Sequence, residues 1–236
     1  MRELLLSGRK VQEVLVEIGL RDRAILDDII DLARESKVPV RDVSPGKLRS
    51  VAKTDAPQGV VARAAPLREF ELEDLLGGRS RKPAPFLVAF DGITDPGNLG
   101  AALRSAECMG VTGVVLPRHR GAHITPTVAK AAAGAIEHLP MALVGGMPSA
   151  LEQLRSLGVW VVGLDEGGDV PIDELRLADE PVVLVMGAEG AGLSRLVRSR
   201  CDVLARIPLG GKLGSLNVAT AATVACYEVR RLRKQR

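Results

Sequence analysis

The segment V-V-L-V-M-G-A-E-G-A-G-L, from Val182 to Leu193, is an apolar run that stops at glycine and is followed by a helical pattern. A second segment of this kind, A-R-I-P-L-G-G-K-L-G-S-L-N-V-A-T-A-A, runs from Ala205 to Ala222. Continuous Val and Leu runs are typical of strands buried on both faces of a parallel sheet. A glycine-rich turn between such a strand and a helix lets backbone N–H groups approach a ligand closely. The two segments therefore predict an α/β fold with a binding site built mostly from main chain.

The same alternation of strand and helix extends over residues 85–236. The predicted strands are Phe86–Phe90, Gly113–Leu116, Met141–Val144, Val159–Leu164, Val182–Met186 and Val203–Ile207. The predicted helices are Asn98–Met109, Thr125–Ala133, Pro148–Leu157, Leu193–Arg198 and Leu216–Leu232. This order favours a mostly parallel sheet with helices on both of its faces.

Residues 1–64 predict a second, smaller α/β domain. Its expected strands are Leu4–Leu6, Val38–Val40 and Gly59–Val61, and its expected helices are Asp22–Glu35 and Pro45–Val51. Residues 65–84 are rich in charge, Pro and Gly, which is typical of a linker. The expected organisation is a domain over residues 1–64, a linker over 65–84 and a larger domain over 85–236.

Composition argues against several classes of protein. The chain of 236 residues is 46% hydrophobic but only 2% aromatic, so a base-stacking platform for single-stranded nucleic acid is not expected. No apolar run approaches the roughly 18 residues that a membrane span needs, and the N-terminal apolar stretch is too short for a signal peptide. The cysteines show neither C-x-x-C spacing nor a nearby histidine cluster, so we expect no disulfide, no metal and a cytoplasmic location; they are Cys108, Cys201 and Cys226.

The first segment that could carry chemistry is D-G-I-T-D-P-G-N-L-G-A-A-L-R-S-A-E-C-M-G, from Asp91 to Gly110. Asn98 is expected to be the N-cap of a helix. Arg104 lies off the apolar stripe of that helix, and Gly100 one turn earlier would leave room beside the guanidinium. A permanently charged planar group suits a phosphate or another anion. The alternative is a surface arginine paired with Glu107.

The two glycine-rich segments carry polar side chains with two interpretations each. The spacing Gly187-x-Glu189-x-x-Gly192 is neither the dinucleotide fingerprint nor a nucleotide-triphosphate loop. Glu189 either has a functional role or complements the dipole of a following helix. Ser215 is expected to cap the last helix, and Asn217 in its first turn favours a side-chain hydrogen-bonding role. Their alternative is an ordinary cap on an ordinary core helix.

These three segments, in this order, resemble the three motifs of the SpoU/TrmH family of SPOUT methyltransferases. The motifs read D-P-x-N-x-G-x-x-x-R-x-A, G-x-E-x-x-G-L and I-P-M/L-x-G-x-x-x-S-L-N-V, and the match covers residue 85 to the end of the chain. Residues 1–64 more loosely resemble the substrate-binding domain of relatives of the 23S ribosomal RNA guanosine methyltransferase RlmB, which is similar to a small ribosomal-protein fold. The opening G-x-N-x-V-x-E-A-L helix of those relatives is absent, which suggests a truncated start.

The resemblance implies an S-adenosylmethionine-dependent ribose 2′-O-methyltransferase with a deep C-terminal trefoil knot and a homodimeric active site. It also implies that RNA is the partner, with ribosomal RNA favoured over transfer RNA. The implied catalytic residues are Arg104, Asn98, Glu189, Ser215 and Asn217. The implied cofactor contacts are Leu164, Gly187, Ile207, Leu209, Leu216 and Asn217. Arg104 would orient the substrate phosphate and help to deprotonate the ribose hydroxyl.

Other functions stay open on sequence alone. A transfer RNA target is the alternative within the same enzyme class. A catalytically inactive RNA-binding or ribosome-assembly protein of the same fold is the alternative outside it. A methyltransferase that confers antibiotic resistance would share the same motifs.

Overall fold

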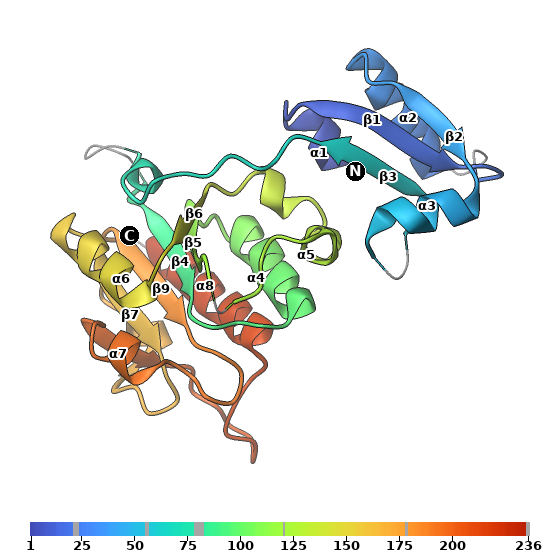
Figure 1. The fold of residues 1–236 in the computed structure, drawn as a ribbon. Helices are drawn as coiled ribbons and strands as arrows, with labels where there is room; N and C mark the ends of the chain where they lie inside the picture. The colour runs from blue at the N-terminus through green and yellow to red at the C-terminus, as the bar shows by residue number, and fades with distance from the viewer. Residues whose placement is uncertain (21–23, 55–56, 78–82, 120, 178, 235–236) are drawn as a thin grey trace.

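The computed structural model describes residues 1–20, 24–54, 57–77, 83–119, 121–177 and 179–234, and it shows two α/β parts joined by an extended segment (Figure 1). In the N-terminal part the elements are α1 (Arg2–Leu6), β1 (Val11–Glu17), α2 (Ala24–Glu35), β2 (Val40–Val43), α3 (Pro45–Ala52) and β3 (Val60–Ala64). The sheet order is β2-β1-β3, with β1 parallel to β2 and antiparallel to β3. The predicted helix at Asp22–Glu35 begins at Ala24 among the described residues, and residues 22 and 23 lie outside them.

One predicted strand of this part is wrong. Leu4–Leu6 belongs to helix α1, in which Leu5 is buried while Leu6 is half exposed. A run of three leucines has no periodicity that separates strand from helix. The strand that pairs with both neighbours is β1, which the sequence analysis did not predict.

The C-terminal part is built on a seven-stranded sheet in which every pairing between strands is parallel. Its order is β6-β5-β4-β9-β7-β10-β8. The strands are β4 (Phe86–Phe90), β5 (Gly113–Pro117), β6 (Met141–Val144), β7 (Trp160–Leu164), β8 (Val170–Pro171), β9 (Val182–Met186) and β10 (Val203–Arg206). The prediction of a mostly parallel sheet is confirmed, and the short edge strand β8 was not predicted.

Helices cover both faces of this sheet, as the sequence predicts (Figure 1). The helices are α4 (Pro96–Cys108), α5 (Pro126–Ala131), α6 (Met147–Ser156), α7 (Arg195–Arg198) and α8 (Val218–Lys234), and the 3-10 turns are η1 (Asp74–Leu76), η2 (Ala135–Glu137) and η3 (Ile172–Glu174). The central strand β4 shows the division. Its Phe86 and Phe90 pack with α4, α5 and α8, while Leu87 packs with α6 and α7.

The start and the end of the C-terminal part are tied together by Arg233 on α8. Its guanidinium donates hydrogen bonds to the carbonyl oxygens of Ala84 at 2.6 Å and Pro85 at 3.2 Å, and to that of Glu180 at 2.9 Å. The same group lies 5.1 Å from the ring centroid of Phe86. The last helix is therefore attached to the strand that begins this part of the chain. The trefoil knot stays a prediction.

Part of the predicted linker packs against the C-terminal sheet. The amide of Phe70 donates to the carbonyl oxygen of Met141 on edge strand β6, at 3.0 Å. Leu72 and Leu75 are buried in the same core as α6. These contacts hold residues 70–76 against the C-terminal part, and the domain boundaries of the sequence analysis stay a prediction.

Candidate active site

A cleft of about 990 Å³ lies where strands β7, β9 and β10 end, and the loops that follow them form its walls. In open parallel sheets, ligands bind beyond the carboxyl ends of the strands. Eight of the residues singled out in the sequence line this cleft; they are Leu164, Gly187, Glu189, Ile207, Leu209, Ser215, Leu216 and Asn217. Strands and loops far apart in the sequence therefore meet at one place.

The first glycine turn is a tight hairpin and leads into no long helix. Ala188 and Gly192 exchange backbone hydrogen bonds at 3.0 and 2.8 Å, with Glu189 between them. A Cβ on Gly187 would lie 2.1 Å from the carbonyl carbon of Gly192, so the turn itself requires glycine there. The following helix α7 begins only at Arg195 and is capped by Ser194. The interpretation of Glu189 as a partner of a helix dipole is therefore wrong.

A hydrogen-bond network joins the three segments at the mouth of the cleft. The Asn98 side-chain amide donates to Glu189 Oε1, and Asn217 Nδ2 donates to Asn98 Oδ1 at 3.0 Å. Asn217 Oδ1 in turn accepts from the amide of Ala219 at 2.9 Å. Asn217 thus caps helix α8 with its oxygen while its NH₂ group reaches the first segment.

Two predicted helix caps are wrong. Helix α4 is capped by Asp95, whose Oδ1 accepts from the amide of Asn98 at 2.6 Å. Helix α8 begins at Val218, so Asn217 takes the position that the sequence analysis assigned to Ser215. Because Asp95 satisfies the free amide of α4, the Asn98 side chain is available for Glu189 and Asn217.

Arg104 lies on the exposed face of α4 and does not line the cleft. Among the described residues its guanidinium has no ion pair, so the expected alternative of a pair with Glu107 is not observed. The idea that Gly100 leaves room beside Arg104 is wrong. A Cβ on Gly100 would lie 2.5 Å from Cβ of Ala131, so this glycine allows α5 to pack closely on α4.

Two positioning contacts were missed by the sequence analysis. Asp91 Oδ2 accepts from Ser194 Oγ at 3.0 Å and from the Ser194 amide at 3.4 Å, which fixes the exit of the hairpin. Asp165, directly after β7, pairs with Arg198 and accepts from the amide of Gly167 at 2.9 Å. Both Asp91 and Asp165 directly follow a buried strand, and this position was the signal that the sequence offered. Their partners, Ser194 and Arg198, lie far away in the sequence and could not be predicted from a local pattern.

Neither Cys201 nor Cys226 is suited to nucleophilic chemistry. Burial raises the pKa of the Cys226 thiol to about 12. Burial raises the pKa of Cys201 to about 11, with smaller contributions from the carboxylates of Asp202 and Asp165. A thiol with a raised pKa carries little thiolate near neutral pH and is a poor nucleophile.

Within the described ranges no group of three or more His, Cys, Asp and Glu side chains is placed to hold a metal ion. The same ranges contain no helix that is both long enough and apolar enough to cross a membrane.

Comparison with known proteins places the fold and the site in a family. Residues 85–227 match the family model described as SpoU rRNA Methylase family, and residues 2–70 match the model described as RNA 2′-O ribose methyltransferase substrate binding. The chain is 37% identical over 237 residues to the putative TrmH family tRNA/rRNA methyltransferase of Staphylococcus haemolyticus strain JCSC1435. That alignment covers 100% of this chain and 94% of the relative.

Two solved structures show the same architecture. The SpoU methyltransferase AviRb from Streptomyces viridochromogenes, solved in complex with the cofactor AdoMet, superposes with a TM-score of 0.82 at 27% identity and covers 99% of this chain and 87% of its own. A structure that concerns 2-OH methylation of C/U34 on tRNA superposes with a TM-score of 0.59 at 28% identity, and covers 65% of this chain and 99% of its own. The narrower resemblance to RlmB stays a prediction. With the three motifs gathered at one cleft, and with family models covering both parts of the molecule, the chain belongs to the SpoU rRNA methylase family of RNA methyltransferases.

Proposed function

We propose that this protein methylates a ribose 2′-hydroxyl in structured 23S ribosomal RNA, in the cytoplasm, as an RlmB-like homodimer. Its family makes it an RNA methyltransferase, and S-adenosylmethionine is the methyl donor. The observation that best supports methyl transfer at this cleft is the hydrogen-bond network of Asn98, Glu189 and Asn217. This network joins all three motifs at the mouth of the cleft.

The cleft has the chemistry that an adenosine-containing cofactor needs. Among the described residues, the backbone groups of 208–216 have no backbone hydrogen-bond partner, so they are available to a ligand. Added Cβ atoms on Gly210, Gly211 and Gly214 would meet nothing within 4 Å, so there is free space beside this loop, and Gly211 and Gly214 line the cleft. Leu209, Leu213 and Leu216 are 41%, 83% and 38% exposed, and they offer apolar surface for a purine ring.

The protein's own contribution to the reaction is positioning. S-adenosylmethionine supplies an electrophilic methyl group on a positively charged sulfur. Leu164, Gly187, Ile207, Leu209 and Leu216 would hold the cofactor through main chain and apolar contacts, as their place along the cleft allows. Asn217 and Glu189, fixed by Asn98, would hold the polar rim where the acceptor ribose enters. Correct placement of two reactants can supply much of the rate enhancement of a transfer reaction.

Arg104 would bind the substrate phosphate and aid removal of the hydroxyl proton. Within one chain it lies outside the cleft, on the exposed face of α4. A second copy of the chain, packed through this face, would bring its Arg104 to the cleft of the first. Isologous contacts of this kind create two equivalent sites in a dimer. Ser215 lines the cleft and would contribute a hydroxyl to the same site.

The N-terminal part favours ribosomal RNA over transfer RNA. The solved structure that concerns tRNA matches only 65% of this chain, although the match spans 99% of that structure's own chain. AviRb matches 99% of this chain, so its fold includes a counterpart of the N-terminal part. The relative from Staphylococcus haemolyticus is named a putative tRNA/rRNA methyltransferase, so transfer RNA is the second candidate.

The direct test maps 2′-O-methylated nucleotides in the RNA of cells with and without this protein. We expect one ribose of 23S ribosomal RNA to lose its methyl group, and the wild-type gene but not Arg104→Ala to restore it. A loss in transfer RNA alone would support the second candidate. If neither RNA changes and calorimetry detects no binding of S-adenosylmethionine, the protein is a non-catalytic RNA-binding member of the fold.

A further inference from the structure

Glu166 brings a carboxylate without a protein partner to the cleft where β7, β9 and β10 end. The charged side chains that line this cleft are Asp165, Glu166, Glu189, Arg206 and Lys212. Within the described part of the chain, Glu166 and Lys212 are the two of this set that form neither an ion pair nor a side-chain hydrogen bond. The Glu166 carboxylate is therefore available to a ligand in the cleft.

Glu166 lies in a β-turn that the surrounding protein holds in place. The amide of Gly168 donates to the carbonyl oxygen of Asp165 at 3.0 Å, which closes the turn around Glu166. The Asp165 side chain accepts from the amide of Gly167 at 2.9 Å and pairs with Arg198 on α7. The backbone on both sides of Glu166 is thus fixed by hydrogen bonds.

Strand β10 supports the same turn from its other side. Arg206 donates to the carbonyl oxygens of Gly168 at 2.7 Å and Asp169 at 2.8 Å. A Cβ on Gly168 would lie 2.6 Å from the carbonyl carbon of Ala205, so the turn packs directly on the backbone of β10. A side chain on a preformed turn binds a ligand without the cost of ordering the backbone.

The strand order places Glu166 and the polar rim of the cleft on different sides of the first glycine turn. Strand β9, which leads into Gly187, lies between β4 and β7 (Figure 1). Asn98 follows β4, whereas Glu166 follows β7. The methyl group has to face the rim, where Asn98 holds the network and the acceptor ribose is proposed to enter. Glu166 is therefore placed for a part of the cofactor away from the reacting sulfur.

The adenosine part of S-adenosylmethionine carries two neighbouring ribose hydroxyls. Each hydroxyl can donate a hydrogen bond, and an ionised carboxylate accepts through two oxygens and donates nothing. Parallel sheets that bind dinucleotides use a glycine-rich turn for the phosphates and an acidic residue for a ribose hydroxyl. Leu164, two residues before Glu166, lines the same cleft and offers apolar surface beside the carboxylate. A purine with its ribose fits this pair of neighbours.

We propose that Glu166 accepts hydrogen bonds from the ribose hydroxyls of S-adenosylmethionine and thereby selects a ribonucleoside cofactor. The inference deepens the proposed function, and it rests on the methyl donor rather than on the RNA target. Because Glu166 contacts the cofactor away from its sulfur, loss of the side chain lowers cofactor affinity and leaves the rate at saturating cofactor close to wild type.

The test measures dissociation constants by calorimetry in the absence of RNA, for wild type, Glu166→Ala and Glu166→Gln. The ligands are S-adenosylhomocysteine and its 2′,3′-dideoxy analogue, which lacks both ribose hydroxyls. Wild type should bind S-adenosylhomocysteine on the order of tenfold more tightly than the analogue, because the analogue cannot donate to the charged group. Glu166→Ala should bind the two ligands with similar Kd. Glu166→Gln keeps one acceptor oxygen and should keep part of the difference.

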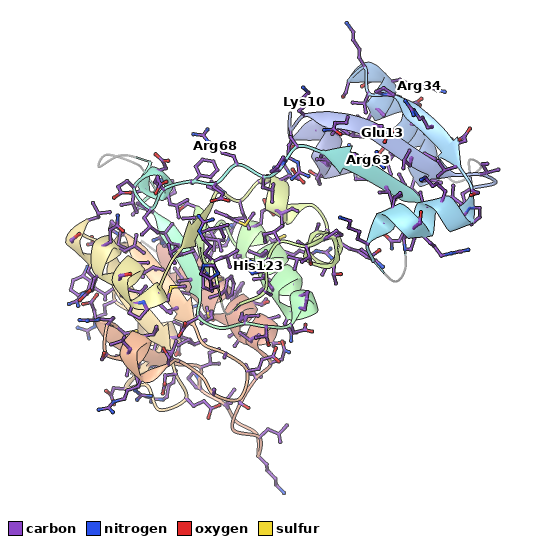
Figure 2. The ribbon with its side chains drawn as sticks, in the orientation of Figure 1. Lys10, Glu13, Arg34, Arg63, Arg68 and His123 are labelled. Atoms are coloured by element: carbon purple, nitrogen blue, oxygen red, sulfur yellow. The ribbon has the colours of Figure 1, made fainter. Side chains whose placement is uncertain are left out.

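Two control variants separate this contact from general effects of charge. Asp169→Ala is the matched control, since Asp169 is exposed, adjoins the same turn and does not line the cleft. Asp31→Ala makes the same change in net charge elsewhere, since Asp31 is exposed and pairs with Arg34 on α2 of the N-terminal part (Figure 2). Both controls should keep the wild-type ratio of the two dissociation constants.

A third ligand, 5′-methylthioadenosine, keeps the ribose hydroxyls and lacks the amino-acid part of the cofactor. Glu166→Ala should raise its Kd by the same factor as that of S-adenosylhomocysteine. An unchanged Kd for this ligand would overturn the proposal, because Glu166 would then bind the amino-acid part. Equal weakening of S-adenosylhomocysteine and its dideoxy analogue would also overturn it. Failure of the proposed function is visible separately, as wild-type protein that binds S-adenosylmethionine but methylates no ribose in RNA.

Discussion

Asn217 donates a 3.0 Å hydrogen bond to Asn98 across 119 positions of sequence, although each residue stands at the start of a different helix. The bond links the first turn of α4 to the cap of α8, and a second bond from Asn98 reaches Glu189. The side-chain amide of Asn98 thus connects the start of α4 to the start of α8 and to the 188–192 hairpin.

Asn98→Ala should lower methyl transfer on the order of 100-fold, because both bonds to the rim of the site are lost and reactive groups lose their alignment. Activity is measured with saturating S-adenosylmethionine. Asp95→Ala is the control, since it removes the cap of α4 and should cost about 1 kcal/mol of stability with a smaller effect on turnover. Equal losses of activity in the two variants would mean that Asn98 acts only through helix stability.

Arg104→Ala should nearly abolish turnover while cofactor affinity is retained, because the side chain lies outside the cofactor cleft. Glu189→Ala should also be inactive. Mixing the two inactive proteins should restore about a quarter of the wild-type rate, since half of randomly paired dimers are mixed and each has one intact site. A mixture that stays inactive would contradict a site shared between two copies.

Ser194→Ala should weaken S-adenosylmethionine binding, because the exit of the 188–192 hairpin loses its bond to Asp91. A double-mutant cycle with Asp91→Ala should give a coupling free energy of about 1 kcal/mol in urea unfolding. Strictly additive free energies of unfolding would show that the two side chains do not support each other.

Gly100→Ala should destabilise the fold by about 1–3 kcal/mol, because its Cβ would overlap Ala131 and the backbone of α5. Gly46→Ala is the matched control, since Gly46 lies in helix α3 and a Cβ there would meet nothing within 4 Å. That control should stabilise by about 0.5–1 kcal/mol. Urea unfolding of both variants gives the comparison, and equal shifts of the same sign would contradict the packing explanation.

Alkylation at about pH 8 should label Cys108, which is exposed, and spare Cys201 and Cys226 until the protein is unfolded. The raised pKa values, about 11 and about 12, mean that the folded state keeps both protons when the unfolded state releases them near 9.0. Stability should therefore fall as the pH rises above that unfolded value. Mass spectrometry identifies the labelled residue, and rapid labelling of Cys226 in the folded protein would contradict its burial.

The sequence predicts the C-terminal sheet well and the contacts of the site poorly. Strands Phe86–Phe90, Met141–Val144 and Val182–Met186 have their predicted bounds, because strands buried on both faces are continuous apolar runs with glycine or proline nearby. The roles of Asp95, Gly100 and Asp91 depend on partners elsewhere in the chain, and no local pattern contains that information. Gly187, Glu189, Ser215 and Asn217 were singled out by the glycine-rich segments, and the resemblance added the other residues that line the cleft; they are Leu164, Ile207, Leu209 and Leu216. The network that joins the polar side chains required the structure.

The attachment of Arg233 to Ala84 and Pro85 has a consequence for biosynthesis. The N-terminal part leaves the ribosome first, in a chain made at about 5–20 residues per second. The C-terminal sheet, by contrast, lacks the apolar face of α8 and the Asn217 cap until α8 has been made. A ribosome that pauses before residue 218 therefore holds a nascent chain in which Asn98, Glu189 and Asn217 have no helix α8 to fix their network.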